Sequence, residues 1–136
     1  MVPDWQLKFH KRSKDGSGKC NVIESDESVF FALFDIDARQ KNDLDRAEGL
    51  GFGYEQRSIE IQGFGECFSY VASDSHIREG LKPYSWYKDL VMVGLEYHEA
   101  PEEYLTLIRA TAHSMDVDQT RHRQNMQIVV EARNGT

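Results

Sequence analysis

The sequence predicts an α+β domain in which a curled sheet or barrel carries helices on one side. About five segments with β-type patterns fill the first half of the chain, and apolar residues at helical spacing follow in the second half. The length of 136 residues suits one domain, and no linker or internal repeat divides it. We therefore expect a single domain over residues 1–136.

The chain opens with a strand pattern, because Trp5, Leu7 and Phe9 alternate with polar residues. The turn KDGSGK follows, and residues 20–23 are expected to return as a partner strand. The run VFFALF over residues 29–34 is continuously apolar and β-prone, which predicts a strand buried on both faces.

A short helix is expected next. Asp37 has Gln40 three places on, a capping-box pattern, and the helical run ends at Glu48. Gly49 stands where a helix commonly ends in a left-handed residue.

The remaining elements follow from similar patterns. Residues 57–62 and 66–72 read as two strands joined through glycines, and residues 85–97 have apolar positions at helical spacing. Pro101 begins another helix with acidic residues in its first turn. The tail over residues 116–132 is expected to form a short helix and then an extended end.

Composition and charge exclude several classes of function. The formal net charge of −7 and the pI near 5.2 oppose a nucleic-acid or anionic-membrane partner. A local cationic cluster near the N-terminus is interpreted as a solvated strand end and turn. It comprises Lys8, His10, Lys11, Arg12 and Lys14.

The two cysteines and the termini bear on location. Cys20 and Cys67 lie far apart, in neither redox-motif nor zinc-ligand spacing, and read as reduced, partly buried thiols. The N-terminus has no apolar signal region and no segment is long enough to span a bilayer. We expect a cytoplasmic protein.

Common catalytic and binding motifs do not fit the sequence. The fragment GSGKC lacks the glycine and the hydroxyl residue of a phosphate-binding loop, and His98-Glu99 lacks the second histidine of a zinc-protease motif. Asp116 and Asp118 could hold a divalent cation, but capping of the following helix is the preferred interpretation.

Glu48 remains the candidate catalytic residue. A glutamate in the last turn of a helix is usually exposed and idle. Here, however, the helix dipole disfavours its charge by about 0.3–1 kcal/mol, and Leu50, Phe52 and Tyr54 follow closely, so desolvation could raise its pKa as a general base requires. The glycines of GLGFG permit positive φ and a close approach of backbone to a ligand.

Several segments together resemble one known family. The order VPDWQLKFHKRS, KCNV, SVFFALFDI, LDRAEG and GY, then SYVAS, WYKDLVMVGL and PEEYLTLI, is similar to the γ-glutamylcyclotransferase-like (AIG2-like) family over nearly the whole chain. The most specific piece is LDxxEG followed by GY. The resemblance implies a small mixed β-barrel flanked by helices.

The resemblance also implies a reaction, namely cyclisation of a γ-glutamyl group to 5-oxoproline with release of an amine or amino acid. Glu48 matches the glutamate that serves as general acid and base in the family. Gly49, Tyr54, Tyr70 and Tyr87 match substrate-binding positions, although plain core packing explains the tyrosines equally well. The resemblance implies a small γ-glutamyl substrate and no metal or organic cofactor.

One departure keeps a second interpretation open. Family members normally open with a strand and a glycine-rich YGSN-type loop that binds the glutamyl group, and no YGSN occurs in this sequence. The domain is therefore expected to lack that strand and loop. The alternative is a non-catalytic module that binds a small acidic metabolite or a protein partner. An open sheet edge would also suit a homodimer, or association with no other role.

Overall fold

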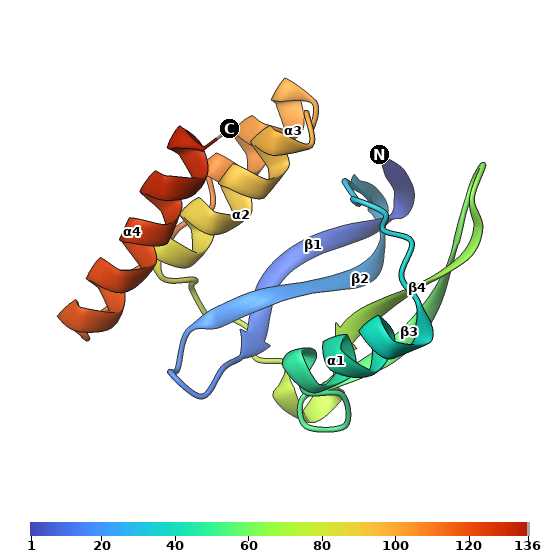
Figure 1. The fold of residues 1–136 in the computed structure, drawn as a ribbon, viewed down its shortest axis with the longest axis horizontal. Coiled ribbons are helices and arrows are strands. Elements are labelled where there is room, and N and C mark those ends of the chain that lie inside the picture. Colours follow the sequence, from blue (N-terminus) through green and yellow to red (C-terminus); the bar gives the residue numbers. More distant parts are fainter. Residues whose placement is uncertain (136) are drawn as a thin grey trace.

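The computed structural model describes residues 1–135 and confirms the α+β class. Its elements, shown in Figure 1, follow in the order β1 (Val2–Arg12), β2 (Gly18–Val29), α1 (Ala38–Glu48), β3 (Tyr54–Ile61), β4 (Gly65–Ala72), the 3-10 turn η1 (Asp74–His76), α2 (Ser85–Tyr97), α3 (Glu102–Arg109) and α4 (Gln119–Asn134).

The strands form two antiparallel hairpins, β1–β2 and β3–β4, each a two-stranded sheet. Across residues 1–135 the strands do not close into a barrel, so that part of the expected architecture is wrong. The amide side chain of Asn21 joins the hairpins where a strand ladder would run: its Oδ1 accepts from the backbone N–H of Ala72 at 2.7 Å. Its Nδ2 lies 2.9 Å from Nε2 of His10. The two hairpins are therefore joined here by a buried side chain in place of backbone hydrogen bonds between strands.

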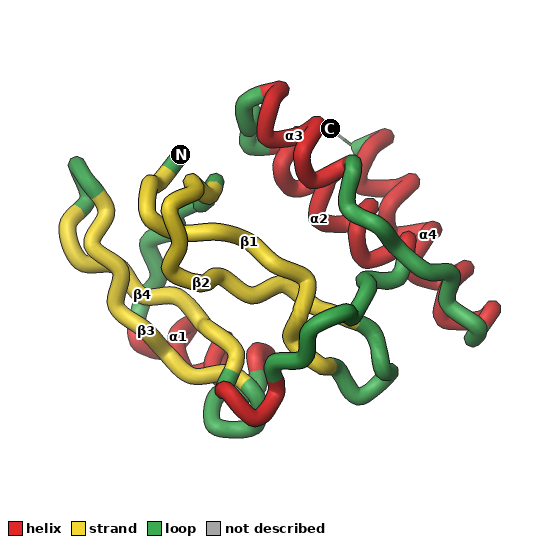
Figure 2. Tube along the Cα trace, turned by 180° about the vertical axis from the view of Figure 1, so that it is seen from behind, coloured by secondary structure: helices red, strands yellow, loops and turns green. Residues whose placement is uncertain are grey.

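The helices lie on two sides of the hairpins rather than on one. In Figures 1 and 2, α2, α3 and α4 gather on one side of β1–β2, whereas α1 lies at the other end of the molecule against β3–β4. The main core forms between the β1–β2 hairpin, strand β3 and helices α2 and α3. It comprises Trp5, Phe9, Val22, Val29, Ile59, Ile61, Met92, Ala100, Tyr104, Leu105 and Ile108.

Two expectations from the sequence are wrong, namely the strand over residues 29–34 and the extended end of the C-terminal tail. Strand β2 ends at Val29, and residues 30–36 have no regular structure. Phe30 and Phe31 still pack on the core, while Phe34 is 71% exposed. Among residues 1–135 no strand pairs with this segment, so its apolar character reflects packing. In the tail, α4 continues to Asn134 in place of an extended end.

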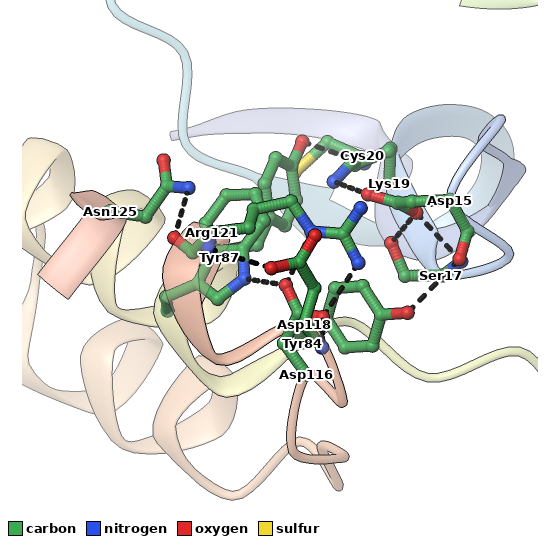
Figure 3. Close-up of polar contacts among 11 residues, drawn as sticks. Asp15, Ser17, Lys19, Cys20, Tyr84, Tyr87, Asp116, Asp118, Arg121 and Asn125 are labelled. Atoms are coloured by element: carbon green, nitrogen blue, oxygen red, sulfur yellow. Dashed lines mark hydrogen bonds and ion pairs between the residues drawn. The ribbon is translucent and has the colours of Figure 1, made fainter. Parts of the chain in front are cut away.

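The β1–β2 turn is fastened to the helices by a polar cluster (Figure 3). Lys19 Nζ lies 3.3 Å from Asp15 Oδ2, and the hydroxyl of Tyr84 donates to the carbonyl of Asp15 at 3.0 Å. Nearby, Asp116 accepts from Arg121 Nε at 2.5 Å and from the indole N–H of Trp86 at 2.9 Å.

Asp118 caps helix α4, since its carboxylate accepts from the backbone N–H of Arg121 at 3.0 Å. This confirms the capping interpretation of the DVD triplet. The carboxylate of Asp116 is fully buried, and its Oδ2 accepts a hydrogen bond from the indole N–H of Trp86.

Candidate active site

Glu48 is the last residue of helix α1 and lies beside the β3–β4 hairpin. Asp37 accepts from the backbone N–H of Gln40 at 2.8 Å and Gln40 returns the bond at 3.0 Å, so the predicted capping box is confirmed. Gly49 ends the helix with φ 69° and ψ 43°, the left-handed conformation that the sequence predicted. Local sequence signals thus determine both ends of this helix.

The glycine turn after Glu48 uses its own backbone donors. The N–H of Leu50 donates to the carbonyl of Asp45 at 2.9 Å, that of Gly51 to Tyr54 at 2.8 Å, and that of Phe52 to Gly49 at 2.8 Å. The N–H of Gly49 also donates back into the helix, to Arg46 at 3.2 Å. These amides therefore shape the turn, and Gly49 has no spare N–H to offer a substrate. Its predicted role in substrate binding stays a prediction.

Glu48 has the electrostatic character expected of a base. Its side chain reaches solvent, yet burial by surrounding groups is the main cause that raises its pKa above the ordinary value of 4.5. The positive charge of Lys11 acts in the opposite direction and lowers the pKa of Glu48. The helix C-terminus adds a further destabilising field on the carboxylate. The structure thus combines partial desolvation with one nearby cation.

A groove of about 510 Å³ runs beside this carboxylate. It lies between α1, strand β4 and the irregular segment after β2, and its lining comes from residues 32–36, Leu44, Glu48 and residues 66–70. The walls are mainly apolar and aromatic, while the charged groups in the lining are all carboxylates. The groove can therefore hold an apolar or amine-bearing group next to Glu48.

Two of the predicted tyrosines lie near Glu48. The hydroxyl of Tyr54 donates to the backbone carbonyl of Cys20 at 2.9 Å, and burial, followed by the nearby Cys20 and Glu48, raises its pKa. Tyr70 lines the groove and its hydroxyl donates to Asp45. Burial, the bond to Asp45 and the charge of Glu48 together raise the pKa of Tyr70. Both hydroxyls therefore stay protonated, and both already have partners within the chain.

Tyr87 lies elsewhere, on the helix side of strand β2. Its hydroxyl accepts from the backbone N–H of Cys20 at 3.1 Å, as Figure 3 shows, and its ring stacks edge-on to Phe9 with the centroids 6.2 Å apart. Burial is the main cause that raises the pKa of the Cys20 thiol to about 11. Tyr54 and Tyr87 thus bond the carbonyl and the N–H of the same residue, but Tyr87 does not line the groove.

Lys11 is the charged residue near Glu48 that the sequence interpretation missed. It belongs to the cluster read as a solvated strand end, yet its side chain is partly buried and lies with Nζ 4.8 Å from the ring centroid of Tyr54. One signal was available, because the alternation of Trp5, Leu7 and Phe9 continues to position 11. A register shift in the β1–β2 pairing between Lys8 and Lys11 interrupts that alternation.

Within residues 1–135, no group of three or more His, Cys, Asp or Glu side chains is arranged to hold a metal ion. In the same part of the chain, none of the helices has both the length and the apolar character needed to cross a membrane.

Comparison with known proteins places this arrangement in a family. The sequence model of the AIG2-like family matches residues 28–108. No curated protein sequence matches the chain significantly. Among solved structures, the uncharacterized protein loc79017 from Homo sapiens is similar with a TM-score of 0.74 and 20% identity, covering 94% of this chain and 80% of that chain. A γ-glutamyl cyclotransferase is similar with a TM-score of 0.68 and 18% identity, covering 96% and 81%.

Proposed function

The chain belongs to the AIG2-like family, and from this premise we propose that it converts a γ-glutamyl amine or γ-glutamyl amino acid into 5-oxoproline. The observation that carries the proposal is Glu48 itself, a partly desolvated carboxylate with a raised pKa at the side of a 510 Å³ groove. Such a group can accept a proton near neutral pH and give it back within one turnover.

The reaction needs few protein groups, because the nucleophile and the electrophile belong to one substrate. The carboxylate of Glu48 takes a proton from the substrate α-ammonium group, and the freed amine attacks the γ-carbonyl carbon. A carbon–nitrogen bond forms and the carbonyl oxygen becomes an oxyanion. The carbonyl then re-forms as the bond to the leaving nitrogen breaks, and protonated Glu48 supplies that nitrogen with its proton. The ring nitrogen passes its remaining extra proton to the released amine.

The groove supports a position for the leaving group. Its lining joins aromatic walls from Phe34, Phe68 and Tyr70 to the carboxylates of Asp35 and Glu66. Apolar contact would hold the body of an amine, and the carboxylates would favour a neutral or cationic leaving group over an anionic one. Glu48 lies in the same lining, which suits transfer of a proton to the departing nitrogen.

The test is a direct assay for 5-oxoproline with several γ-glutamyl amines, comparing wild type with Glu48→Gln. Loss of general acid–base catalysis typically costs about 10²- to 10⁴-fold in rate, so the variant should fall in that range. Glu60→Gln, at an exposed position on β3, is the matched control and should retain activity. Activity that survives Glu48→Gln would contradict the mechanism.

A binding module without catalysis is the second candidate. The observation that favours it is that the amides of Gly49, Leu50, Gly51 and Phe52 are all hydrogen-bonded within the turn, so they cannot serve as oxyanion donors. Phe52 is also 87% exposed beside Glu48. Absence of 5-oxoproline from every substrate, with wild type and Glu48→Gln binding γ-glutamyl compounds equally, would establish this alternative.

A further inference from the structure

Lys11 differs from the other lysines that are buried or partly buried. Lys8 lies 4.0 Å from Glu79. Lys19 lies 3.3 Å from Asp15, and Lys41 lies 2.5 Å from Asp45. Lys88 donates to two backbone carbonyls at 3.0 and 2.8 Å. Among residues 1–135, in contrast, no hydrogen bond or ion pair reaches the ammonium group of Lys11.

The fold makes room for this ammonium group. A Cβ on Gly53 would lie 3.2 Å from Lys11 Cε and 3.3 Å from Nζ, closer than ordinary contact, so a larger residue here would displace the lysine end by a few tenths of an ångström. On another side, the ring of Tyr54 lies 4.8 Å from Nζ and offers its negative face. The lysine end is therefore held between a turn of the backbone and an aromatic ring.

The surroundings leave the positive charge incompletely compensated. Burial, followed by the like charge of Lys19, lowers the pKa of Lys11, while Asp15 and Glu48 act in the opposite direction without forming an ion pair with it. Removing an ammonium group from water is unfavourable unless an anion accompanies it. An anionic ligand beside Lys11 would supply that partner.

We propose that Lys11 binds the α-carboxylate of the γ-glutamyl substrate while Glu48 receives the proton of its α-ammonium group. This inference rests on the proposed cyclotransferase function. The substrate carries a negative and a positive group on one carbon atom. The protein presents Glu48 where α1 ends and Lys11 against Gly53 and Tyr54, where the turn that follows α1 ends. Lys11 is thus a specificity-determining residue. It orients the α-carbon of the substrate by binding the α-carboxylate, whose charge does not change in the reaction.

A purely electrostatic role of Lys11 predicts different behaviour. If Lys11 only tuned the pKa of Glu48, its loss would slow every substrate alike. If it binds the α-carboxylate, its loss matters only for substrates that carry this group. A pair of substrates that differ in that single group separates the two roles.

The experiment compares γ-glutamyl methylamide with 4-aminobutyryl methylamide, which lacks the α-carboxylate and would cyclise to 2-pyrrolidinone. Wild type should prefer the first by about 10- to 100-fold in kcat/KM, the range for one hydrogen bond to a charged group. Lys11→Met should lose most of that preference, because the ratio of kcat/KM between the two substrates cancels any change in the basicity of Glu48. Lys14→Met, at an exposed lysine of the same hairpin, should keep the preference.

A binding measurement makes the inference independent of turnover. NMR titration with 5-oxoproline and with 2-pyrrolidinone should show carboxylate-dependent binding in wild type, weaker in Lys11→Met and partly restored in Lys11→Arg. Thermal unfolding confirms that each variant is folded.

Lys11-dependent binding of 5-oxoproline without any cyclisation would refute the proposed function and support the lysine site. Cyclisation with an unchanged substrate preference in Lys11→Met would support the proposed function and refute the lysine site. Equal slowing of both substrates, or no binding of 5-oxoproline, would overturn the assignment of Lys11.

Discussion

Replacement of Asn21 by alanine tests what holds the two hairpins, and with them the candidate site, together. The side chain of Asn21 is 3% exposed, and the residues that it bonds, His10 and Ala72, are 6% and 5% exposed. Its orientation follows from chemistry: the N–H of Ala72 can only donate, so the amide oxygen must face it. The amide nitrogen then donates to Nε2 of His10, which places the ring proton on Nδ1, 3.3 Å from Glu79 Oε1.

Alanine at position 21 would leave two buried groups without partners, the N–H of Ala72 and Nε2 of His10. An unsatisfied buried polar group costs about 1–3 kcal/mol, and some relief by water or a change of tautomer at His10 brings the expected loss to about 2–4 kcal/mol. This is a large share of the ~5–15 kcal/mol that a domain of this kind has in total. The change should therefore affect the entire fold.

Urea unfolding followed by fluorescence of the tryptophans measures this loss. With a slope of about 1–3 kcal/mol per molar urea, the midpoint should fall by roughly 1–2 M. Asn42→Ala, at an exposed position in helix α1, is the matched control and should change stability by less than about 0.5 kcal/mol. A loss in Asn21→Ala no greater than in the control would refute the view that this amide joins the hairpins.

Three further predictions concern the site and its support. The rate of 5-oxoproline formation should fall as pH drops through a pKa above 4.5, because burial raises the pKa of Glu48 and only its ionised form is a base; a flat profile would contradict this. Tyr70→Phe removes a hydroxyl bond to α1 and should speed amide exchange of that helix about 2- to 10-fold, measured by mass spectrometry. Gly18→Ala places a Cβ 2.1 Å from the carbonyl of Phe9 and should cost about 1–3 kcal/mol by thermal unfolding, whereas Gly94→Ala has open space and should not.

Local signals predicted much of the fold. The capping box at Asp37, the left-handed Gly49 and the two hairpins all depend on residues close in sequence, and each is confirmed. The segment over residues 29–34 was mispredicted because an apolar run reports burial without naming a partner strand. Its residues line the core and the groove although their backbone is irregular. A pattern of apolar residues cannot predict such a conformation.

The candidate site was only partly predictable for a related reason. Glu48 was found because the helix end and the following glycines are adjacent to it in sequence. Its place in the lining with β4, and the approach of Lys11 from β1, depend on tertiary packing. Tyr87 was grouped with Tyr54 and Tyr70 by resemblance, yet it lies behind strand β2, where its hydroxyl accepts a backbone bond. Residue type alone could not show which of these tyrosines lines the groove, and a substrate-binding role for each of them stays a prediction.

The glycines after Glu48 show how the fold and the proposed chemistry fit together. Because the amides of the turn are already bonded, the glycines serve by conformation: Gly49 and Gly51 take φ values of 69° and 82° that reverse the chain. That reversal starts strand β3 at Tyr54, whose ring meets Lys11, and the missing side chain of Gly53 leaves space for the ammonium group. A single turn therefore joins Glu48 to the residues that contact Lys11, and the proposed orientation of a substrate with both charges on one carbon requires no backbone donor from this turn.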